Sequence, residues 1–561
     1  MKKLIILFTF CFLNNFAQNT TFEGETIFLH TNASTFITGE TLIYKIYCRN
    51  AATKEASKIS KIAYVEIINE KGESITRNKI ILKEGVASNE MFISTQFTTG
   101  TYKLVAYTNW MLNNMVNTYF ETELTVINPF LPYKNSRKET TSETIVSSTT
   151  DAQPMPLQSS AITLKSNKSK YSKREAVSIA LSDDTGQFTD GIYSLSVRKI
   201  DGLSQKNSPS SAEFMQKTSE PLLATDAPKY LPELRGEIVS GKITTRDENK
   251  SIKDVHVGAS IVGEPFDLKI VKTNSDGAFH FILDETINTP KLQLQLIENS
   301  ITDYQLTINP PAKIATPTNF SKVKITEKDI ATIEERLVAS QIVNAYAVKD
   351  SISGNSTTVP FYHYNAKEYV LDNYKRFPSF KETIIEIIPA VYFKENNGDF
   401  SLHIRDYQTG GDSFGSALVI IDGLLLQDVT ELFDYNTKNI YKIDVINKAY
   451  AYGSKIFSGV ISITTFSKAY ASKSNTIVPV QIERCKDDSA FVPKKYDTQT
   501  DYSRIPDYRY QLAWEPSIKL NKTNATQTFF TSDVEGLFEI SLEGFSKNGT
   551  PVSIKDYFEV K

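Results

Sequence analysis

Runs in which apolar and polar residues alternate recur along most of the chain, and they limit its fold more than any other feature. ETLIYKIYCRN (40–50), KIAYVEIINEKGESI (61–75) and GTYKLVAYTNW (100–110) are three of them. Successive side chains of a strand point to opposite faces, so such runs predict strands that bury one face. Turn residues separate the runs at a spacing typical of a β-sandwich. The sequence therefore predicts a mainly β protein.

The chain has 561 residues, too many for one hydrophobic core, so we expect several domains in series. With 40% hydrophobic and 23% charged residues, the composition is that of ordinary globular domains. The predicted units are a signal peptide (1–18), a β-sandwich (19–130), a Ser/Thr-rich linker (131–160), a second small β-sandwich with a loop (161–233), a third β-sandwich (234–311), an α/β domain (312–470) and a small terminal β-domain (471–561).

The first 18 residues have the pattern of a secretory signal peptide. Lys2 and Lys3 precede a short apolar run that ends at Leu13, and the small residue Ala17 follows. No later stretch reaches 18 uninterrupted apolar residues, so we expect no transmembrane segment of the chain's own. These patterns predict an exported protein, in the periplasm or associated with the outer membrane; surface exposure and release stay open.

The period of the apolar residues changes after residue 320. TEKDIATIEERLVASQIV (326–343) opens with Thr326 and Asp329, close to a capping box, and predicts a helix. FPSFKETIIEIIP (377–389) predicts a second, shorter helix that Pro389 ends. Strands return after it. The expected fold class is thus mainly β and multidomain, with serial β-sandwiches followed by an α/β domain and a small terminal β-domain.

Residues 416–466 contain four phrases in order: VIIDG (419–423), IYKIDVI (440–446), YGSKIFSGV (452–460) and ISITT (461–465). In these features the segment resembles the second half of the plug domain of TonB-dependent outer-membrane receptors. The resemblance implies a plug-like α/β domain that contacts a partner. The candidate partner-binding residues are Asp422, Gly423, Tyr452, Gly453 and Gly459.

A plug of this family sits inside a β-barrel, yet only residues 467–561 follow the plug-like segment. A transmembrane strand takes about 9–11 residues plus a turn, and the smallest barrels have about eight strands. We therefore expect no barrel within this remainder, and we expect the plug-like domain to act as a docking module.

Two further resemblances concern the predicted sandwiches. FITGETLIYKIYCRN (36–50), AYVEIINEKGE (63–73) and GTYKLVAYTNWM (100–111) resemble a macroglobulin-type domain. The third sandwich resembles a carboxypeptidase regulatory-like domain through a T-x-x-D-G-x-F-x-F strand made by Thr273, Asp276, Gly277, Phe279 and Phe281. The reactive CGEQ motif of thioester macroglobulins is absent from the sequence, so covalent trapping has no support.

The sequence gives no catalytic motif, and we expect a non-enzymatic protein without a cofactor or a metal. Its five histidines are scattered and never take the spacing of a metal motif. Outside the signal peptide the chain has two cysteines, Cys48 and Cys485. We interpret them as small buried residues, because they pair only if the first and last predicted domains touch.

The leading hypothesis is an accessory or scaffold protein of the cell envelope that contacts an outer-membrane β-barrel system in receptor function, secretion or assembly. Nothing in the formal net charge of −3 indicates a nucleic-acid partner. A first alternative is a glycan- or peptidoglycan-binding module, with Tyr107, Trp110, Tyr508 and Trp514 as candidate surface aromatics. A second is a non-covalent macroglobulin-like protease inhibitor with residues 134–160 as bait.

Overall fold

The structure is a computed structural model of the whole chain. It describes residues 23–561 apart from 115–117, 133–160, 204–207, 219–227, 285–286, 298–302, 316, 347–359, 363, 365, 406–414, 490, 497–503 and 523–524. The predicted signal peptide and nearly all of the predicted linker at 131–160 lie outside the described residues. The fold is mainly β, with several sandwiches and one α/β unit, as the sequence predicts. Within the described residues, no helix has the length and apolar composition needed to cross a bilayer.

The first sandwich comprises residues 25–127. One sheet has the order β1-β3-β6 and the other the order β2-β8-β7-β4-β5. The strands are β1 (Glu25–Thr31), β2 (Thr35–Ile37), β3 (Thr41–Asn50), β4 (Ile62–Ile68), β5 (Ser74–Ile81), β6 (Val86–Phe92), β7 (Gly100–Tyr107) and β8 (Phe120–Ile127). Alternate residues face the core, where Phe28 meets Phe120 edge-on with ring centroids 5.7 Å apart.

The second sandwich is assembled from two distant parts of the chain. Its sheets have the orders β10-β32-β31-β12-β29 and β30-β11-β9. The early strands are β9 (Ile162–Ser166), β10 (Lys170–Tyr171), β11 (Ala176–Asp183) and β12 (Ile192–Lys199), and the late ones are β29 (Gln511–Ile518), β30 (Ala525–Phe530), β31 (Gly536–Phe545) and β32 (Pro551–Val560). The sequence predicts two separate domains here, and the structure corrects this to one.

The register of β12 gives the physical reason. This strand pairs with β31 over eight residues, from Ile192 opposite Phe545 to Lys199 opposite Phe538. Its inward residues Tyr193, Leu195 and Val197 are fully buried. In its sheet, β12 lies between the late strands β31 and β29, so the early strands alone leave both of its edges without partners. The facing sheet β30-β11-β9, which covers this apolar face, also takes one late strand.

The third sandwich has sheets of order β16-β13-β18 and β15-β14-β17-β28. Its strands are β13 (Glu237–Thr245), β14 (His256–Ile261), β15 (Asp267–Lys272), β16 (Ala278–Leu283), β17 (Lys291–Ile297), β18 (Tyr304–Ile308) and β28 (Val478–Gln481). Gly277 has φ of +74° in the turn before β16, as the sequence predicts. The edge strand β28 comes from the predicted terminal domain, so this sandwich too is discontinuous.

The α/β unit, residues 361–470, is inserted before β28. Its mixed sheet has the order β19-β24-β27-β22-β23, with β22 parallel and β24 antiparallel to β27. The elements are β19 (Lys367–Val370), η4 (Leu371–Asn373), α3 (Phe380–Ile387), β20 (Val391–Asn396), β21 (Asp399–Ile404), β22 (Leu418–Ile421), β23 (Leu424–Leu425), α4 (Thr430–Phe433), η5 (Thr437–Asn439), β24 (Ile440–Ile446), β25 (Tyr450–Tyr452), β26 (Lys455–Phe457) and β27 (Val460–Thr465). The predicted short helix is α3, whose N-terminus Ser379 caps.

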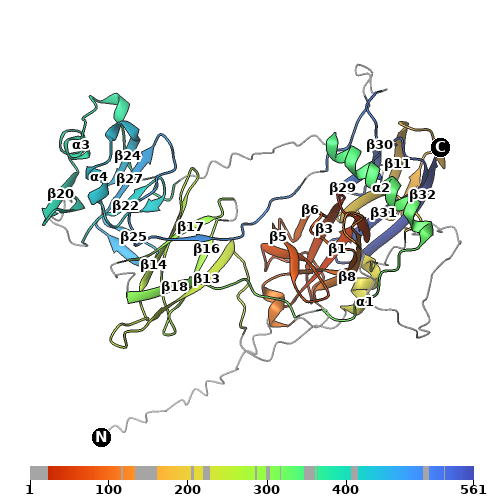
Figure 1. Cartoon of the computed structure of the whole chain (residues 1–561), viewed down its shortest axis with the longest axis horizontal. Coiled ribbons are helices and arrows are strands. Elements are labelled where there is room, and N and C mark those ends of the chain that lie inside the picture. Colours follow the sequence, from red (N-terminus) through yellow and green to blue (C-terminus); the bar gives the residue numbers. More distant parts are fainter. Residues whose placement is uncertain are drawn as a thin grey trace, which may run out of the picture.

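The long helix α2 (Glu327–Ala345) forms with the predicted capping box of Thr326 and Asp329. The sequence places it in the α/β domain, whereas in the structure it packs against the first and second sandwiches, far from α3 (Figure 1). Ile333 packs with Ile37 and Ile127 of the first sandwich. The periodicity specifies an apolar helix face but not the surface that covers it. Two further short helices are η1 (Trp110–Asn113) and α1 (Ser211–Lys217).

A strap, residues 482–489, runs from β28 across the first sandwich. The Lys486 backbone N–H donates to the Lys79 carbonyl at 2.7 Å, and that of Ser489 to the Ser88 carbonyl at 2.9 Å. Cys485 packs against the first sandwich, and both Cys485 and Cys48 are free and buried, as their interpretation as small buried residues expects. The second sandwich and α2 lie at the opposite end of the molecule from the α/β unit (Figure 1).

Candidate functional site

The Asp422–Gly423 turn of the plug-like segment is covered by the chain itself. Asp422 is 4% exposed, and its carboxylate accepts hydrogen bonds from the Thr465 N–H at 2.7 Å and the Tyr470 N–H at 3.0 Å. Both turn residues have positive φ, +48° and +85°. A side chain at position 423 would overlap Phe266 of the third sandwich. The turn therefore closes the end of the sheet and seats it on the chain's own neighbouring domain.

Tyr452 and Gly453 dock on strand β15 in the same way. The Tyr452 hydroxyl donates to the Leu268 carbonyl, and its ring stacks on Phe361 with centroids 4.0 Å apart. A side chain at Gly453 would strike the Ile270 carbonyl. Gly459 lies inside the α/β unit, where its φ of +159° lets the backbone pass close to the Ile446 carbonyl.

A buried apolar cluster joins the α/β unit to the third sandwich. It contains Leu268, Ile270, Ile297, Tyr362, Leu418, Ile420, Leu425, Ile446, Phe457 and Val460. Each fully buried side chain of this kind contributes about 1.5–3 kcal/mol relative to exposure. The cluster thus forms a continuous apolar contact between the two units. Four of the five candidate partner-binding residues, all except Gly459, face this internal contact in the structure.

Two of the four candidate surface aromatics are buried, which corrects their prediction as surface groups. Trp514 is 1% exposed and its ring packs against the tilted His30 ring with centroids 5.1 Å apart, where the first and second sandwiches meet. Tyr107 is 1% exposed, and its hydroxyl donates to Glu66. Trp110 is half-buried and donates to the Glu23 carbonyl at 2.8 Å. Tyr508 is 37% exposed. The structure does not bring the four together.

A groove of about 1160 Å³ lies between the first and third sandwiches. One wall is the outer face of sheet β2-β8-β7-β4-β5, with Tyr64 and Arg77. The other is the outer face of sheet β16-β13-β18, with Ser240 and His280. Residues of the segments 229–231, 309–312 and 480–483 also line the groove. We call this the inter-sandwich groove.

Buried ion pairs form the floor of the inter-sandwich groove. Glu237 is fully buried, and its carboxylate meets Lys79 Nζ at 2.6 Å and Arg484 Nη1 at 2.5 Å. Arg484 comes from the strap, and it also donates to the Ile287 carbonyl at 2.9 Å. This carboxylate therefore links three parts of the chain. Removing one member of such a buried pair costs about 3–5 kcal/mol, because the other charge is left without compensation.

Glu233 lies beside this ion-pair floor, in the segment that connects α1 to β13. It is 1% exposed and accepts hydrogen bonds from the Tyr64 hydroxyl and the Ile238 N–H, each at 3.0 Å. Burial raises the pKa of this carboxyl to about 7, against smaller opposing contributions led by Lys79. The group therefore titrates near neutral pH at the junction of two sandwiches.

Exposed aromatic and cationic side chains gather on the α/β unit. Phe466 is 54% and Tyr441 39% exposed, and their ring centroids lie 5.6 Å apart. The Arg376 guanidinium lies 5.6 Å from the Phe466 ring. It is held by the Thr437 carbonyl at 2.8 Å and by Asp372 Oδ1 at 2.7 Å. We call Arg376, Tyr441 and Phe466 the aromatic–arginine patch.

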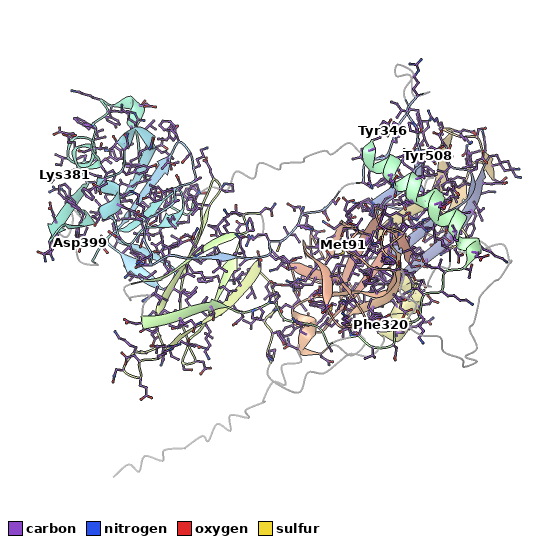
Figure 2. All side chains as sticks on the ribbon, in the orientation of Figure 1. Met91, Phe320, Tyr346, Lys381, Asp399 and Tyr508 are labelled. Carbon is purple, nitrogen blue, oxygen red and sulfur yellow. The ribbon has the colours of Figure 1, made fainter. Side chains whose placement is uncertain are left out.

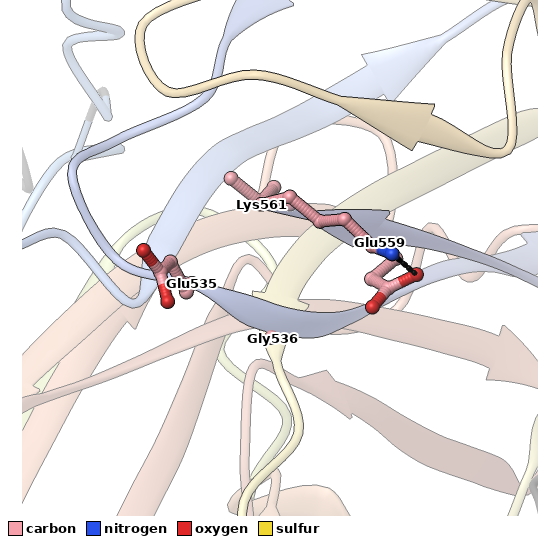
Figure 3. A pocket seen from close by; sticks show the side chains of 5 residues that line it. Glu535, Gly536, Glu559 and Lys561 are labelled. Carbon is pink, nitrogen blue, oxygen red and sulfur yellow. Dashed lines mark ion pairs between the residues drawn. The ribbon is translucent and has the colours of Figure 1, made fainter.

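A second, shallower hollow lies at the end of the second sandwich (Figure 3), lined by Glu535, Gly536, Glu559, Val560 and Lys561. Lys561 pairs with Glu559 at 3.7 Å, and Lys170 reaches the same carboxylate at 3.0 Å. These are exposed surface pairs of small energetic weight. Within the described residues, no three His, Cys, Asp or Glu side chains gather in a way that could hold a metal ion.

No protein-family model matches the sequence, and no curated protein matches it significantly. Solved structures that align with the chain include α2-macroglobulin of Escherichia coli activated by porcine elastase, at 8% identity and a TM-score of 0.24, over 96% of this chain and 44% of that one. Salmonella α2-macroglobulin reacted with methylamine aligns at 9% identity and a TM-score of 0.24, over 96% and 39%. The adhesin InvE of Yersinia pseudotuberculosis aligns at 9% and 0.13, over 50% and 57%.

The chain spans less than half the length of these macroglobulins. Their names agree with the macroglobulin-type resemblance of the first predicted sandwich. The resemblances to a receptor plug and to a carboxypeptidase regulatory-like domain stay predictions.

The inter-sandwich groove and the aromatic–arginine patch were not predicted from the sequence. The groove is built by segments as far apart as residues 64 and 483, and no local pattern links them. The patch left a weak signal, since Tyr441 near the start of β24 and Phe466 just after β27 lie at the same end of an antiparallel pair, where the alternation predicts solvent exposure.

Proposed function

We propose that the chain is a non-enzymatic scaffold of the bacterial cell envelope that docks a partner through its α/β unit. The aromatic–arginine patch carries this proposal. Aromatic and arginine side chains dominate the binding energy of protein interfaces, and those held in place before binding lose less entropy. Arg376 is held by two backbone carbonyls and one carboxylate.

The proposed partner is an outer-membrane β-barrel protein of a receptor, secretion or assembly system. This choice rests on the resemblance of residues 416–466 to a receptor plug. The large internal contact with the third sandwich supports a scaffold role, because it fixes the orientation in which the α/β unit is presented. Export to the periplasm or the outer membrane is part of the same proposal.

The structure bears on the glycan-binding alternative but not on the protease-inhibitor alternative. Glycan stacking on the sequence-predicted aromatics loses support, because Tyr107 and Trp514 are buried. The bait segment of the protease-inhibitor alternative, residues 134–160, lies outside the described residues, so that alternative stays a prediction without a structural argument.

The test is a mild-detergent pull-down from the native envelope with the tagged full-length chain. Point variants are better baits than a deletion of 312–470, which would also remove α2 from the other end of the molecule. We expect the wild type to recover a barrel protein and the double variant Tyr441→Ser, Phe466→Ser to lose it. Tyr508→Ser is the matched control, since this exposed tyrosine lies at the opposite end from the α/β unit (Figure 2). Equal recovery by all baits, or by none, would contradict the proposal.

A further inference from the structure

The inter-sandwich groove offers side chains rather than backbone to a ligand. Both walls are outer faces of sheets, so alternate residues of each strand point into the space. Along β13, Val239 is buried in the third core, whereas Ile238 and Ser240 stay partly exposed on the groove side. Recognition in this groove therefore depends on the chemistry of these side chains.

The lining is rich in amides and hydroxyls. Its polar neutral members are Asn109, Ser240, Asn274, Thr307, Asn309 and Gln481. Asn309 Nδ2 donates to the Ser240 hydroxyl oxygen at 3.0 Å, so the hydroxyl hydrogen of Ser240 can point to a ligand. Leu231, Pro310 and Pro311 add small exposed apolar surfaces. Donors and acceptors next to small apolar patches suit the hydroxyl groups and the C–H faces of sugar rings.

The groove carries an excess of positive charge in a chain whose formal net charge is −3. Its cations Arg77 and Lys79 are paired with Glu483 and Glu237. Lys229 and Lys272 also line the groove, and both are exposed. Neither forms an ion pair with any residue that the structure describes. A cleft lined by charge of one sign concentrates ligands of the opposite sign.

An extended peptide fits this groove less well than a glycan. A peptide gains affinity by adding a strand to an exposed sheet edge, which needs free backbone N–H groups. Of the edge strands that contribute to the lining, β28 contains Pro479, β18 is followed by Pro310 and Pro311, and β5 already pairs with Lys486 of the strap; β15 and β16 contain no proline. Proline has no N–H to donate.

We propose that the inter-sandwich groove binds an acidic oligosaccharide, with carboxylates of its sugar units at Lys229 and Lys272 and its hydroxyls on the amide and hydroxyl side chains. This binding is independent of docking through the aromatic–arginine patch, so either can fail without the other. At about 1160 Å³, the groove has room for a short run of sugar rings.

The test is a calorimetric titration of the full-length chain with oligomers of galacturonic acid, with neutral galactose oligomers and a polyglutamate peptide as comparison ligands. We expect binding of the acidic oligosaccharide alone, weakened at least tenfold when salt is raised from 0.05 to 0.5 M. No binding, or equal binding of the neutral oligomer, would overturn the proposal. Equal binding of polyglutamate would overturn the assignment to a glycan.

Substitutions in the groove lining test whether the ligand binds in the groove. Lys229→Glu with Lys272→Glu reverses both free charges, and Ser240→Trp fills the space from the sheet wall. Each should reduce affinity at least tenfold. Lys253→Glu reverses one charge at an exposed position of the third sandwich outside the groove lining, and it should bind like the wild type. Melting curves check that each variant is folded. Unchanged affinity in all folded variants would show that the ligand binds elsewhere.

Discussion

His30 lies where the first and second sandwiches meet, and its environment admits only the neutral imidazole. It is 5% exposed, its Nδ1 lies 2.7 Å from Ser194 Oγ, and its ring packs against Trp514. Burial, with a smaller contribution from Lys555, lowers its pKa to about 3. Since the unfolded state binds this proton near pH 6.5, the stability from this site is complete above pH 6.5 and is lost as pH falls towards 3.

We predict that His30→Gln reduces the loss of stability between pH 6.5 and pH 4. A glutamine can keep a hydrogen bond to Ser194 but does not titrate. The wild type should lose about 1.4 kcal/mol per pH unit more than the variant in this window. Urea unfolding at pH 7, 5.5 and 4 measures the difference, and parallel pH profiles of the two proteins would refute the assignment.

Glu233 gives the opposite pH dependence. The raised pKa of about 7 means that the folded state holds a proton that the unfolded state releases near pH 4.5. Stability from this site is therefore present below pH 4.5 and is lost as pH rises to 7. Tyr64, Lys79 and Glu237 are the titratable groups that act on it.

We predict that Glu233→Gln melts at a higher temperature than the wild type at pH 8 and at a similar temperature at pH 4.5. The neutral amide can accept the Ile238 N–H with its oxygen and donate its NH2 to the Tyr64 hydroxyl oxygen, without the cost of a buried charge. Thermal melts at the two pH values measure this. A variant less stable than the wild type at pH 8 would mean that the charged carboxylate stabilises the junction.

Among the elements, α2 shows what joins the first two sandwiches. Arg336 on this helix is 2% exposed. It meets Glu40 of the first sandwich at 2.5 Å and Asp201, which follows β12 of the second, at 3.0 Å. It also donates to the Thr35 carbonyl at 2.9 Å. The neighbouring Arg336 and Arg198 lower the pKa of Glu40 against the effect of burial.

We predict that Arg336→Ala destabilises the protein by about 3–5 kcal/mol, because two buried carboxylates lose their cation. Lys328→Ala, an exposed position on the same helix, should change stability by less than about 0.5 kcal/mol. Chemical denaturation compares both with the wild type. A loss below about 1 kcal/mol in Arg336→Ala would show that the helix is held by its apolar contacts alone.

The same elements show how far sequence reasoning reaches. The capping box of Thr326 and Asp329, the helix 380–387 and the turn at Gly277 depend on neighbours in sequence and were predictable. The strands of the second sandwich were also predictable one by one. Alternation indicates that one face of β12 is buried, but it does not indicate that residues 536–545 pair with its edge.

In the candidate site, too, the local features were predictable and the distant partners were not. The plug-like phrases marked Asp422, Tyr452 and their glycines as residues with specific contacts, and the structure gives them such contacts. Gly423, Tyr452 and Gly453 contact the third sandwich, which presents an apolar sheet face to the α/β unit. The Asp422 carboxylate and Gly459 contact residues of the α/β unit itself. A sequence pattern records that a surface is covered, but the identity of the covering surface depends on the tertiary arrangement.

At the scale of the whole molecule, the chain forms one interleaved body rather than beads in series. The strands of the second sandwich come from before residue 200 and after residue 510, so the segment between them is an insertion in that sandwich. The α/β unit is likewise an insertion in the third sandwich. Pairing of β12 with β31 joins residues more than 300 positions apart, so we expect slow folding in which the second sandwich forms last.

The most direct test of this interleaving is hydrogen exchange measured by mass spectrometry on the full chain and on a chain that ends at residue 505. We predict that the shortened chain loses amide protection in residues 176–199, because β11 and β12 lose their partners β30, β29 and β31. Residues 440–465 of the α/β unit serve as the internal control and should stay protected. Protection of residues 176–199 that survives the truncation would contradict the shared sandwich and restore two separate domains.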